Sequence, residues 1–295
     1  MDLWLIGELA LTGALVGLMY ALVALGIVLV YKTSGVANFA QGAIAMTGGY
    51  ATWAFATLLG APLFLAIPLA LATMFAVGFL IERAVLRHMV GQPVIMIIMV
   101  TFGMEIFLRG VMPGLFGVSV KRLDLGIPQA PLFVGEMLIN RAYLIGGLAS
   151  AALIVAAIVL FNSRAGIVMR AVSDDQGASW SVGIRVERAI AIAWGLSAGS
   201  ATAAGILWGA TQGVDWSLSL LLMKALAIAI LGGLDSIPGV LLAGLIVGVC
   251  ESLATGIVDP LVGGGTRDIV ASLIILMTLL VRPYGLFGRE QIERV

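Results

Sequence analysis

Long apolar runs alternate with short polar interruptions along almost the whole chain. A helix needs about 20 predominantly apolar residues to cross a bilayer. The pattern therefore predicts an all-α, polytopic membrane helix bundle with nine crossing segments. Because two of the segments are short, eight or ten crossings remain alternatives. The predicted segments cover residues 9–31, 43–59, 62–81, 93–112, 142–161, 189–210, 218–231, 240–258 and 269–281.

Two of the interruptions, residues 34–42 and 232–239, contain glycine and polar residues but little charge. Unwound backbone at membrane depth must face protein or a cavity, and transporters often carry a pair of broken helices in their two halves. The two interruptions therefore suggest two broken or re-entrant regions beside a pathway. Tight surface turns between hairpin helices are the alternative.

Residues 162–188 form a long polar stretch between two membrane-length segments. Asp174 is expected to cap a helix, Asp175 to lie in its first turn, and Gly183 to stop it. We therefore expect a short helix over residues 175–182 that lies outside the membrane. Such a helix suits docking into a groove of another protein, and an ordinary connecting loop is the alternative. It would present three side chains with little charge: Ala178, Trp180 and Val182.

The composition places the chain outside the range of soluble domains. Of its 295 residues 61% are hydrophobic and 11% are charged, and the mean hydropathy is +1.13. We expect a single transmembrane domain over residues 1–295, with no cleaved signal at the start. The net charge of zero argues against nucleic acid as a partner. Cys250 and His88 are the only residues of their types, so no internal disulfide and no metal site is expected.

The basic residues orient the segments, because lysine and arginine collect on the cytoplasmic side of membrane proteins. With the N-terminus outside and nine alternating segments, ten basic residues face the cytoplasm and six lie elsewhere. This orientation places the C-terminus and the 162–188 loop in the cytoplasm. The ten are Lys32, Arg83, Arg87, Arg164, Arg170, Arg185, Arg188, Arg282, Arg289 and Arg294.

Charged residues inside predicted spans are a second indication of function, because ionisable groups are costly there. Glu105 and Arg109 are four residues apart on one helix, so a structural ion pair is expected. Lys224 is expected near the outer boundary, with its amine extended to the surface. For Glu251 a structural partner and a pathway role are both open.

No catalytic motif can be recognised in the chain. The nearest approach to an ATP-binding loop is GIVLVYKT at residues 26–33, where tyrosine occupies the position of the second glycine inside a span. The single histidine excludes a HExxH zinc site, and no GxSxG sequence occurs. We therefore expect a protein that is not an enzyme and holds no cofactor. Any ATP hydrolysis would take place on another chain.

The order and spacing of several short sequence motifs in the chain resemble those of a known family. The chain resembles permeases of the branched-chain amino acid ABC importer family, specifically the H-type subunit of the leucine–isoleucine–valine system. The resemblance covers about residues 9–288. Its motifs are GLMYAL at 17–22, GVANFAQG at 35–42, ER at 82–83, GIVMRAV at 166–172, GI at 183–184, LGG at 231–233, SIPG at 236–239 and RPYGLFG at 282–288.

The chain departs from the family pattern at three places. Members usually carry histidine where Gln41 stands and glycine where Asp235 stands. The coupling pattern of ABC importers, Glu-Ala-Ala-x-x-x-Gly, corresponds here to GASWSVG at residues 177–183, without the acid and the second alanine. The small residue, the spacing to Gly183 and the short helix remain, so the resemblance still implies docking on an ATPase.

The resemblance implies a bacterial inner-membrane importer with several partners. These are a second, homologous permease, two cytoplasmic ATPases that bind ATP and Mg, and a periplasmic substrate-binding protein. ATP-driven closure of the ATPases would move the short helix and rock the two spans attached to it. The residues implied in ATPase coupling are Asp174, Asp175, Ala178, Trp180, Val182, Gly183 and Ile184.

The substrate would pass between the two permeases near the two breaks. Asn38, Gln41 and Ser236 would offer hydrogen bonds to a passing solute, Phe39 would form part of an apolar gate, and Asp235 would lie beside the pathway. Branched-chain amino acids, urea, short amides and small aromatic acids are all candidate substrates. The partner permease is either a second copy or a different protein.

Two other classes of transporter are alternatives to an ABC importer. An ion-coupled secondary transporter would use Glu105, Glu251 or Asp235 as its coupling acid. A passive channel would require a ring of subunits and downhill flux.

Overall fold

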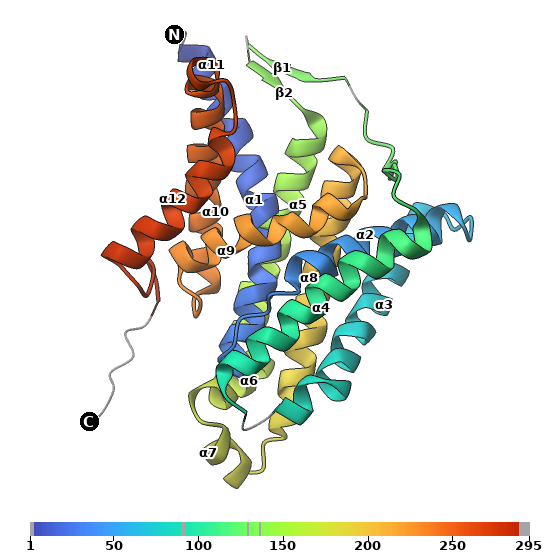
Figure 1. Ribbon diagram of the computed structural model, residues 1–295, viewed down its shortest axis with the longest axis vertical. Helices are drawn as coiled ribbons and strands as arrows, with labels where there is room; N and C mark the ends of the chain where they lie inside the picture. Colours follow the sequence, from blue (N-terminus) through green and yellow to red (C-terminus); the bar gives the residue numbers. More distant parts are fainter. Residues whose placement is uncertain (1–2, 90–91, 129, 136, 289–295) are drawn as a thin grey trace.

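Helix α1 (Leu3–Ser34) runs through the centre of the molecule (Figure 1). The computed structural model describes residues 3–89, 92–128, 130–135 and 137–288. α1 is apolar on every side, and 94% of its most apolar 18-residue stretch is buried inside the protein. The most apolar 18-residue stretch of α4 (Val94–Phe116) is only 11% buried. Helices that are apolar all round require apolar surroundings. α1 finds them inside the bundle, and α4 has an outer surface suited to lipid.

Small residues bring the neighbouring helices close to α1. α10 (Ile237–Ile257) packs along it, with α5 (Arg141–Asn162) and α8 (Val186–Gln212) also in contact. Gly13 and Gly17 of α1 face Gly244 and Gly248 of α10 through backbone atoms. Small residues four apart allow helix backbones to approach closely in lipid. Glycine on both helices therefore explains this tight antiparallel pair.

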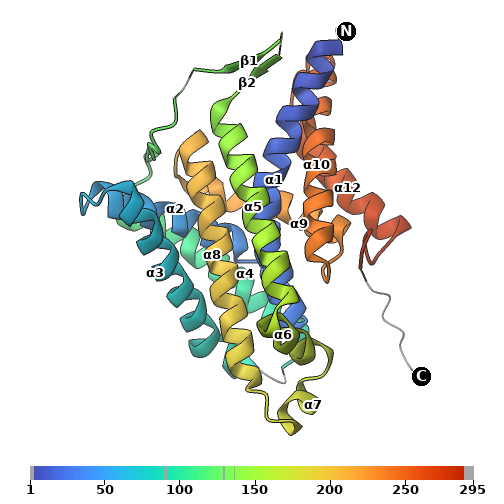
Figure 2. The same cartoon turned by 180° about the vertical axis from the view of Figure 1, so that it is seen from behind.

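The remaining long helices form two groups on either side of α1 (Figure 1). α2 (Gln41–Thr57), α3 (Leu63–Ala84) and α4 lie on one side, and α3 and α2 both pack on α8. α12 (Thr266–Val281) lies on the other side, against α10, and α9 (Leu221–Gly232) crosses α1 and packs on both α10 and α12. Seen from behind, α5 and α8 lie in front of α1 (Figure 2).

Short elements close the two ends of the bundle. At the end where α1 begins lie the hairpin of β1 (Leu132–Val134) and β2 (Met137–Ile139), which pair antiparallel, and the single-turn helix α11 (Asp259–Val262) (Figure 1). At the opposite end lie α6 (Arg164–Asp174) and α7 (Gln176–Ser181). The described residues also include the 3-10 turns η1 (Leu86–Met89) and η2 (Trp216–Leu220).

The predicted helical bundle is confirmed, and each predicted segment corresponds to a helix. Within the described residues, six helices are long and apolar enough to cross a membrane, and the segment 216–232 is a shorter apolar helix. The count of nine crossings therefore stays a prediction. Two elements were not predicted: the β-hairpin of β1 and β2, and α6, which lies inside the polar stretch 162–188. The predicted cytoplasmic C-terminus, with Arg289 and Arg294, lies outside the described residues.

Candidate functional site

The first break in the helices holds a buried polar network. α1 ends at Ser34 and α2 begins at Gln41. Asn38, between the two helices, and Gln41, the first residue of α2, are almost fully buried. Asn38 Nδ2 donates to Gln41 Oε1 at 3.1 Å, and Ser197 Oγ donates to the same oxygen at 2.9 Å. Gln41 Nε2 donates to the Ser197 carbonyl at 3.1 Å. The network therefore joins the break to α8.

The network requires glycine at position 26. A Cβ at Gly26 would collide with the Gln41 amide, and the Gly26 carbonyl oxygen lies 2.9 Å from Ser197 Oγ, whose single hydrogen is shared between this carbonyl and Gln41 Oε1. Gly26 is eight residues from the end of α1, which is about 12 Å at 1.5 Å per residue. The first break therefore lies deep within the bundle. A surface turn, the alternative interpretation, is wrong for this break.

Phe39 and Thr101 connect the break to α4. The Phe39 amide donates to Thr101 Oγ1 at 3.3 Å, and the half-buried Phe39 ring packs against the hydrophobic core. Thr101 and Ser197 were not predicted, because a single hydroxyl in an apolar helix gives no local sequence signal. The structure thus brings Asn38, Phe39 and Gln41 together with these two hydroxyls. Whether a solute passes beside them stays a prediction.

The second break lies between α9 and α10. Gly233 has a φ of +94°, a conformation that glycine adopts without strain, and Ser236 Oγ caps α10 by accepting from the Gly239 amide at 3.1 Å. Lys32 Nζ donates to the Asp235 carbonyl at 2.7 Å. Asp235 and Ser236 are half-buried.

The two breaks lie at about the same level along α1. Gly17 contacts Gly244, which is seven residues into α10, so α10 begins about 10 Å beyond that contact. Gly26 lies nine residues beyond Gly17, or about 14 Å. The levels agree within about one helical turn. Both predicted breaks are therefore at similar depth, as expected for paired broken helices.

Glu105, Arg109, Lys224 and Glu251, the charged residues singled out in the predicted spans, each lie within 4 Å of an oppositely charged group. Arg109 Nη1 lies 3.4 Å from Glu105 Oε1, which confirms the predicted pair. Lys224 was expected to reach the surface, and this is wrong, because its residue is only 8% exposed and Nζ lies 2.8 Å from Glu251 Oε1. Packing between α9, α10 and α12 turns the lysine inward. Two residues of α12 join this ion pair. Arg267 Nε lies 3.3 Å from Glu251 Oε2, and Asp268 Oδ1 lies 3.0 Å from Lys224 Nζ.

The polar stretch 162–188 contains the predicted short helix, observed as α7. Its N-cap is Asp175, whose Oδ1 accepts from the Ala178 amide at 2.9 Å. The predicted cap at Asp174 is wrong, because Asp174 is the last residue of α6. Because α6 extends to Asp174, the capping residue of α7 is Asp175, one position later than predicted.

Gly183 ends α7, as predicted. Its φ is +84°, its amide donates to the Trp180 carbonyl at 3.0 Å, and the Ile184 amide donates to the Ser179 carbonyl at 3.0 Å. This pair of bonds is a Schellman motif, in which glycine supplies the left-handed residue. The side chain of Ile184 packs with Val172, Val186 and Ala189, so it anchors the loop to α6 and α8.

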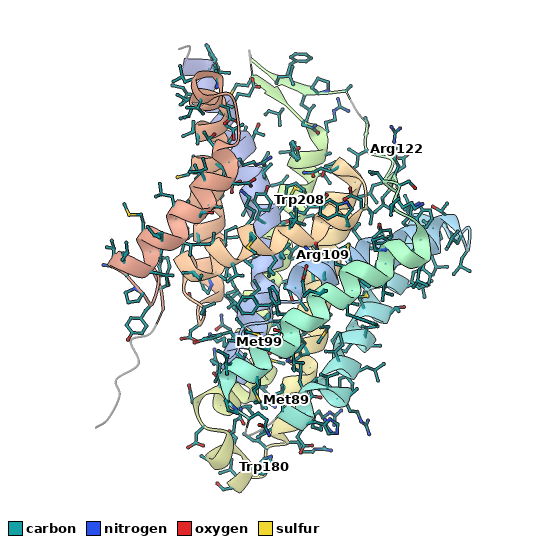
Figure 3. The ribbon with its side chains drawn as sticks, viewed as in Figure 1. Met89, Met99, Arg109, Arg122, Trp180 and Trp208 are labelled. Carbon is teal, nitrogen blue, oxygen red and sulfur yellow. The ribbon has the colours of Figure 1, made fainter. Side chains whose placement is uncertain are left out.

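α7 leaves apolar side chains exposed at the tip of the molecule (Figure 3). Trp180 is 64% exposed and Val182 is 75% exposed, and Ala178 is exposed beside them. A groove lies next to α7, lined by Phe79 of α3, Trp180 and residues 183–188. Exposed aromatic side chains beside a groove are typical of protein interaction sites.

The fold defines a polytopic membrane protein with a short helix, α7, whose apolar side chains are exposed at one end of the bundle. The family model of the branched-chain amino acid transport system permease component matches residues 9–281. The chain belongs to this family. It is a transport permease and not an enzyme, and the ion-coupled alternative is not favoured.

Relatives with names from branched-chain amino acid transport match over nearly their whole length. The permease protein BraD of Pseudomonas aeruginosa, from a high-affinity branched-chain amino acid transport system, is 31% identical over 300 residues, covering 96% of both chains. LivH of Salmonella typhimurium is 29% identical, also over 96% of both chains. A probable LivH of Methanocaldococcus jannaschii is 28% identical, over 95% of this chain and 92% of the relative.

Among solved structures, PsaBC from Streptococcus pneumoniae in complex with Fab matches 92% of this chain and 91% of its own. The sequence identity is 14% and the TM-score is 0.49.

Proposed function

We propose that this chain is one permease subunit of an ABC importer in a bacterial inner membrane, forming half of a pathway for branched-chain or related hydrophobic amino acids. A second homologous permease forms the other half. Two cytoplasmic ATPases bind ATP and Mg, and a periplasmic binding protein delivers the substrate. The family membership supports the class, and the named relatives support the substrate.

The exposed apolar tip of α7 is the observation that carries the coupling role. α7 is tied to α5 through α6 and to α8 through the Gly183 turn, so a force on α7 reaches two long helices. Asp175, Gly183 and Ile184 hold the helix in place, and Ala178, Trp180 and Val182 form the surface that contacts the ATPase. Nucleotide binding on the ATPase would favour one position of α7 and so one state of the bundle.

The docking helix also orients the chain. α7 lies at the end of the bundle opposite the start of α1 (Figure 1). With α7 in the cytoplasm, the N-terminus lies outside, in agreement with the distribution of basic residues. Nine crossings and a cytoplasmic C-terminus complete this topology. The two breaks then lie at membrane depth, with Asn38, Phe39, Gln41, Asp235 and Ser236 beside the pathway.

Co-purification tests the proposal. The full chain is purified from its native membrane, and we expect two ATPases and a second permease with it. The double variant Trp180→Ala/Val182→Ala should lose the ATPases and keep the second permease, because the substitutions remove only the exposed apolar contact. Leu261→Ala is the matched control, because Leu261 is 81% exposed at the opposite end in α11.

The transport assay uses the purified complex in vesicles with its binding protein. We expect uptake of radiolabelled leucine that requires ATP and survives collapse of the ion gradients. Competition by urea, a short amide and a small aromatic acid identifies the preferred class. A wild-type chain that purifies alone, or uptake that follows an ion gradient, contradicts the proposal.

A further inference from the structure

Arg109 of α4 places a cation near the middle of a membrane-length helix. Glu105 is the central residue of α4, eleven residues from Val94 and eleven from Phe116, and α4 is long and apolar enough to cross a membrane. Arg109 Nη1 lies 3.4 Å from Glu105 Oε1, so the side chain points back toward this centre, as helical side chains lean toward the N-terminus of their helix. Figure 3 shows Arg109 midway between the two ends of the bundle.

The guanidinium of Arg109 has accessible donors that this pairing leaves unused. The Arg109 side chain is 39% exposed, whereas Glu105 is only 6% exposed. Within the described part of the chain, Arg109 Nε and Nη2 take part in no hydrogen bond or ion pair, and neither atom is buried. Glu105 therefore holds the guanidinium at Nη1, and the edge formed by Nε and Nη2 stays open.

Lipid cannot satisfy these open donors. Charged side chains within membrane spans face protein or a water-filled cavity in almost every case, because hydrocarbon offers no hydrogen bonds. Phe107, which is 64% exposed, suits a lipid contact, but two residues along a helix bring a side chain to the opposite side. One side of α4 is therefore suited to lipid, and the side with Arg109 faces water or protein.

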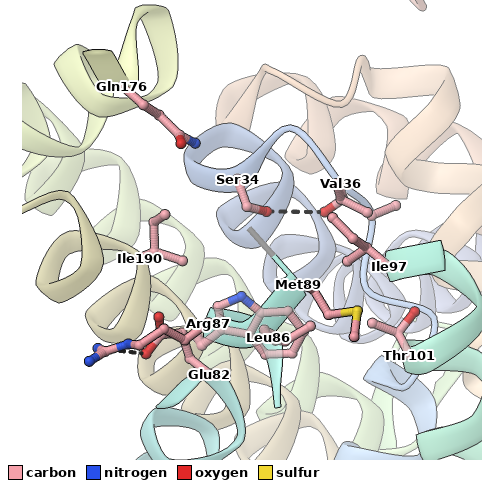
Figure 4. A pocket seen from close by; sticks show the side chains of 12 residues that line it. Ser34, Val36, Glu82, Leu86, Arg87, Met89, Ile97, Thr101, Gln176 and Ile190 are labelled. Atoms are coloured by element: carbon pink, nitrogen blue, oxygen red, sulfur yellow. Dashed lines mark hydrogen bonds and ion pairs between the residues drawn. The ribbon is translucent and has the colours of Figure 1, made fainter. Parts of the chain in front are cut away.

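The side of α4 that carries Arg109 leads to the first break. Thr101, Glu105 and Arg109 follow one another at intervals of four, so they form one row on the helix. Thr101 Oγ1 accepts from the Phe39 amide, and Thr101 also lines a cavity of about 140 Å³ beside the end of α1 (Figure 4). Arg109 lies about 12 Å further along α4, toward the end of the bundle where α1 begins (Figure 1). A solute that enters from that end would meet Arg109 before the break.

We propose that this side of α4 lines an aqueous pathway, and that the open edge of Arg109 binds the carboxylate of the amino acid that enters it. This inference rests on the proposed function and adds a substrate-binding residue to it. A guanidinium suits a carboxylate because two parallel N–H donors meet its two oxygens. The negative charge of Glu105 offsets part of the attraction, so the bound amino acid can leave toward the break.

Cysteine accessibility tests which side of α4 faces water. Cys250 is the only cysteine of the chain, so Cys250→Ser gives a background without thiols. Phe102→Cys and Phe107→Cys are compared in that background. Both phenylalanines are exposed and lie within three residues of the centre of α4. Phe102 is seven residues, or about two turns, before Arg109 and lies on its side, whereas Phe107 lies on the opposite side.

The full chain, with the subunits that accompany it, is placed in lipid nanodiscs and treated with a charged, water-soluble thiol reagent. We expect Phe102→Cys to react at least about tenfold faster than Phe107→Cys, because the reagent attacks the thiolate, which forms in water and not in lipid.

Protection by ligands then tests the carboxylate site. L-leucine should slow the reaction of Phe102→Cys. L-leucinamide has the same side chain and ammonium group but no carboxylate, so it should protect at least about tenfold less well. Arg109→Gln should abolish protection by leucine, and Arg109→Lys should retain part of it, because the charge remains without the planar fork. Arg122→Gln, at an exposed position outside the spans, is the control and should leave protection unchanged.

Equal reaction rates of the two cysteines overturn the aqueous side of α4. The carboxylate site is overturned by the absence of protection by leucine, by equal protection from leucinamide, or by protection that survives Arg109→Gln. If Arg109→Gln fails to fold, the comparison of leucine with leucinamide decides, because it leaves Arg109 in place. ATP-driven leucine uptake by the Cys250→Ser chain is measured in parallel. Uptake without these effects overturns only this inference, and the absence of uptake overturns the proposed function.

Discussion

Gly17 of α1 lies directly against the backbone of Gly244 in α10. A Cβ on Gly17 would meet the Gly244 carbonyl, and a Cβ on Gly244 would come within 2.8 Å of the Gly17 carbonyl oxygen. Glycine on both sides lets the two helices approach to backbone contact. Since Gly244 is seven residues into α10, this contact also sets the level of the second break relative to the first.

Gly17→Ala should therefore separate α1 from α10. Inserting one methyl group into a close-packed interface typically costs about 1–3 kcal/mol, and here the colliding atoms belong to backbone that cannot rotate away. We expect a lower unfolding temperature in nanodiscs. Gly110→Ala in α4 is the control, because no atom lies within 4 Å of a Cβ there. Equal stability of both variants would contradict the close packing described for α1 and α10.

Gln41→Leu should destabilise the first break and impair uptake. The leucine cannot pair with Asn38 Nδ2 or with Ser197, and each buried polar group left unpaired costs about 1–3 kcal/mol. Thr52→Ala is the control for stability, because Thr52 is buried but its hydroxyl bonds only to the Gly48 carbonyl of its own helix. Unfolding temperature and ATP-driven leucine uptake are measured together.

Asp235→Ala separates a pathway role from a structural one. The hydrogen bond from Lys32 goes to the backbone carbonyl of Asp235, so removal of the carboxylate leaves that bond in place. We expect an unfolding temperature close to that of the wild type and a changed rate or selectivity of uptake. Unchanged uptake in both Asp235→Ala and Gln41→Ala would contradict the pathway assigned to the two breaks.

Lys224→Met should destabilise the protein by up to about 3 kcal/mol, because it leaves the buried Glu251 carboxylate with one cationic partner in place of two. Glu251, only 1% exposed, would keep a single partner at Arg267. The double variant Lys224→Met/Glu251→Gln should cost less than the sum of the two single variants, because no buried charge is then unpaired. A double-mutant cycle on the free energy of unfolding measures this coupling. Arg122→Met, at an exposed position, should change stability by less than about 0.5 kcal/mol.

The turn between α11 and α12 should contribute stability only above acidic pH. Hydrogen bonds from the Thr266 hydroxyl and amide hold the pKa of Asp259 below its usual value of 3.8. A lowered carboxyl pKa stabilises the folded state above the unfolded pKa, and this contribution disappears as the pH falls through the folded pKa. The difference in unfolding temperature between wild type and Asp259→Asn should be present at neutral pH and disappear as the pH falls through the lowered pKa that Asp259 has in the folded state. A constant difference would contradict the assignment.

Much of the loop at residues 162–188 was predictable from local sequence. Gly183 was expected to end the helix because glycine favours a positive φ, and the Schellman bonds confirm it. The capping residue was predicted one position too early, because local propensity does not show that α6 continues to Asp174. The inward turn of Lys224 was missed for a related reason. Its acidic partners, Glu251 and Asp268, are distant in sequence and meet it only through helix packing.

The sequence alone determined the helical membrane fold, the positions of the two breaks and the family resemblance, because hydrophobic runs and glycine positions act locally along the chain. Only the tertiary structure decided which residues meet. Ser197 reaches Gln41 and Glu187 reaches Arg87 because packed helices bring together segments that are 156 and 100 residues apart. Arg87 reaches Glu82 because the 3-10 turn η1 directly follows α3. The depth of each break likewise depends on how α1, α8 and α10 pack, since a helix has no register against its neighbours until their side chains interlock.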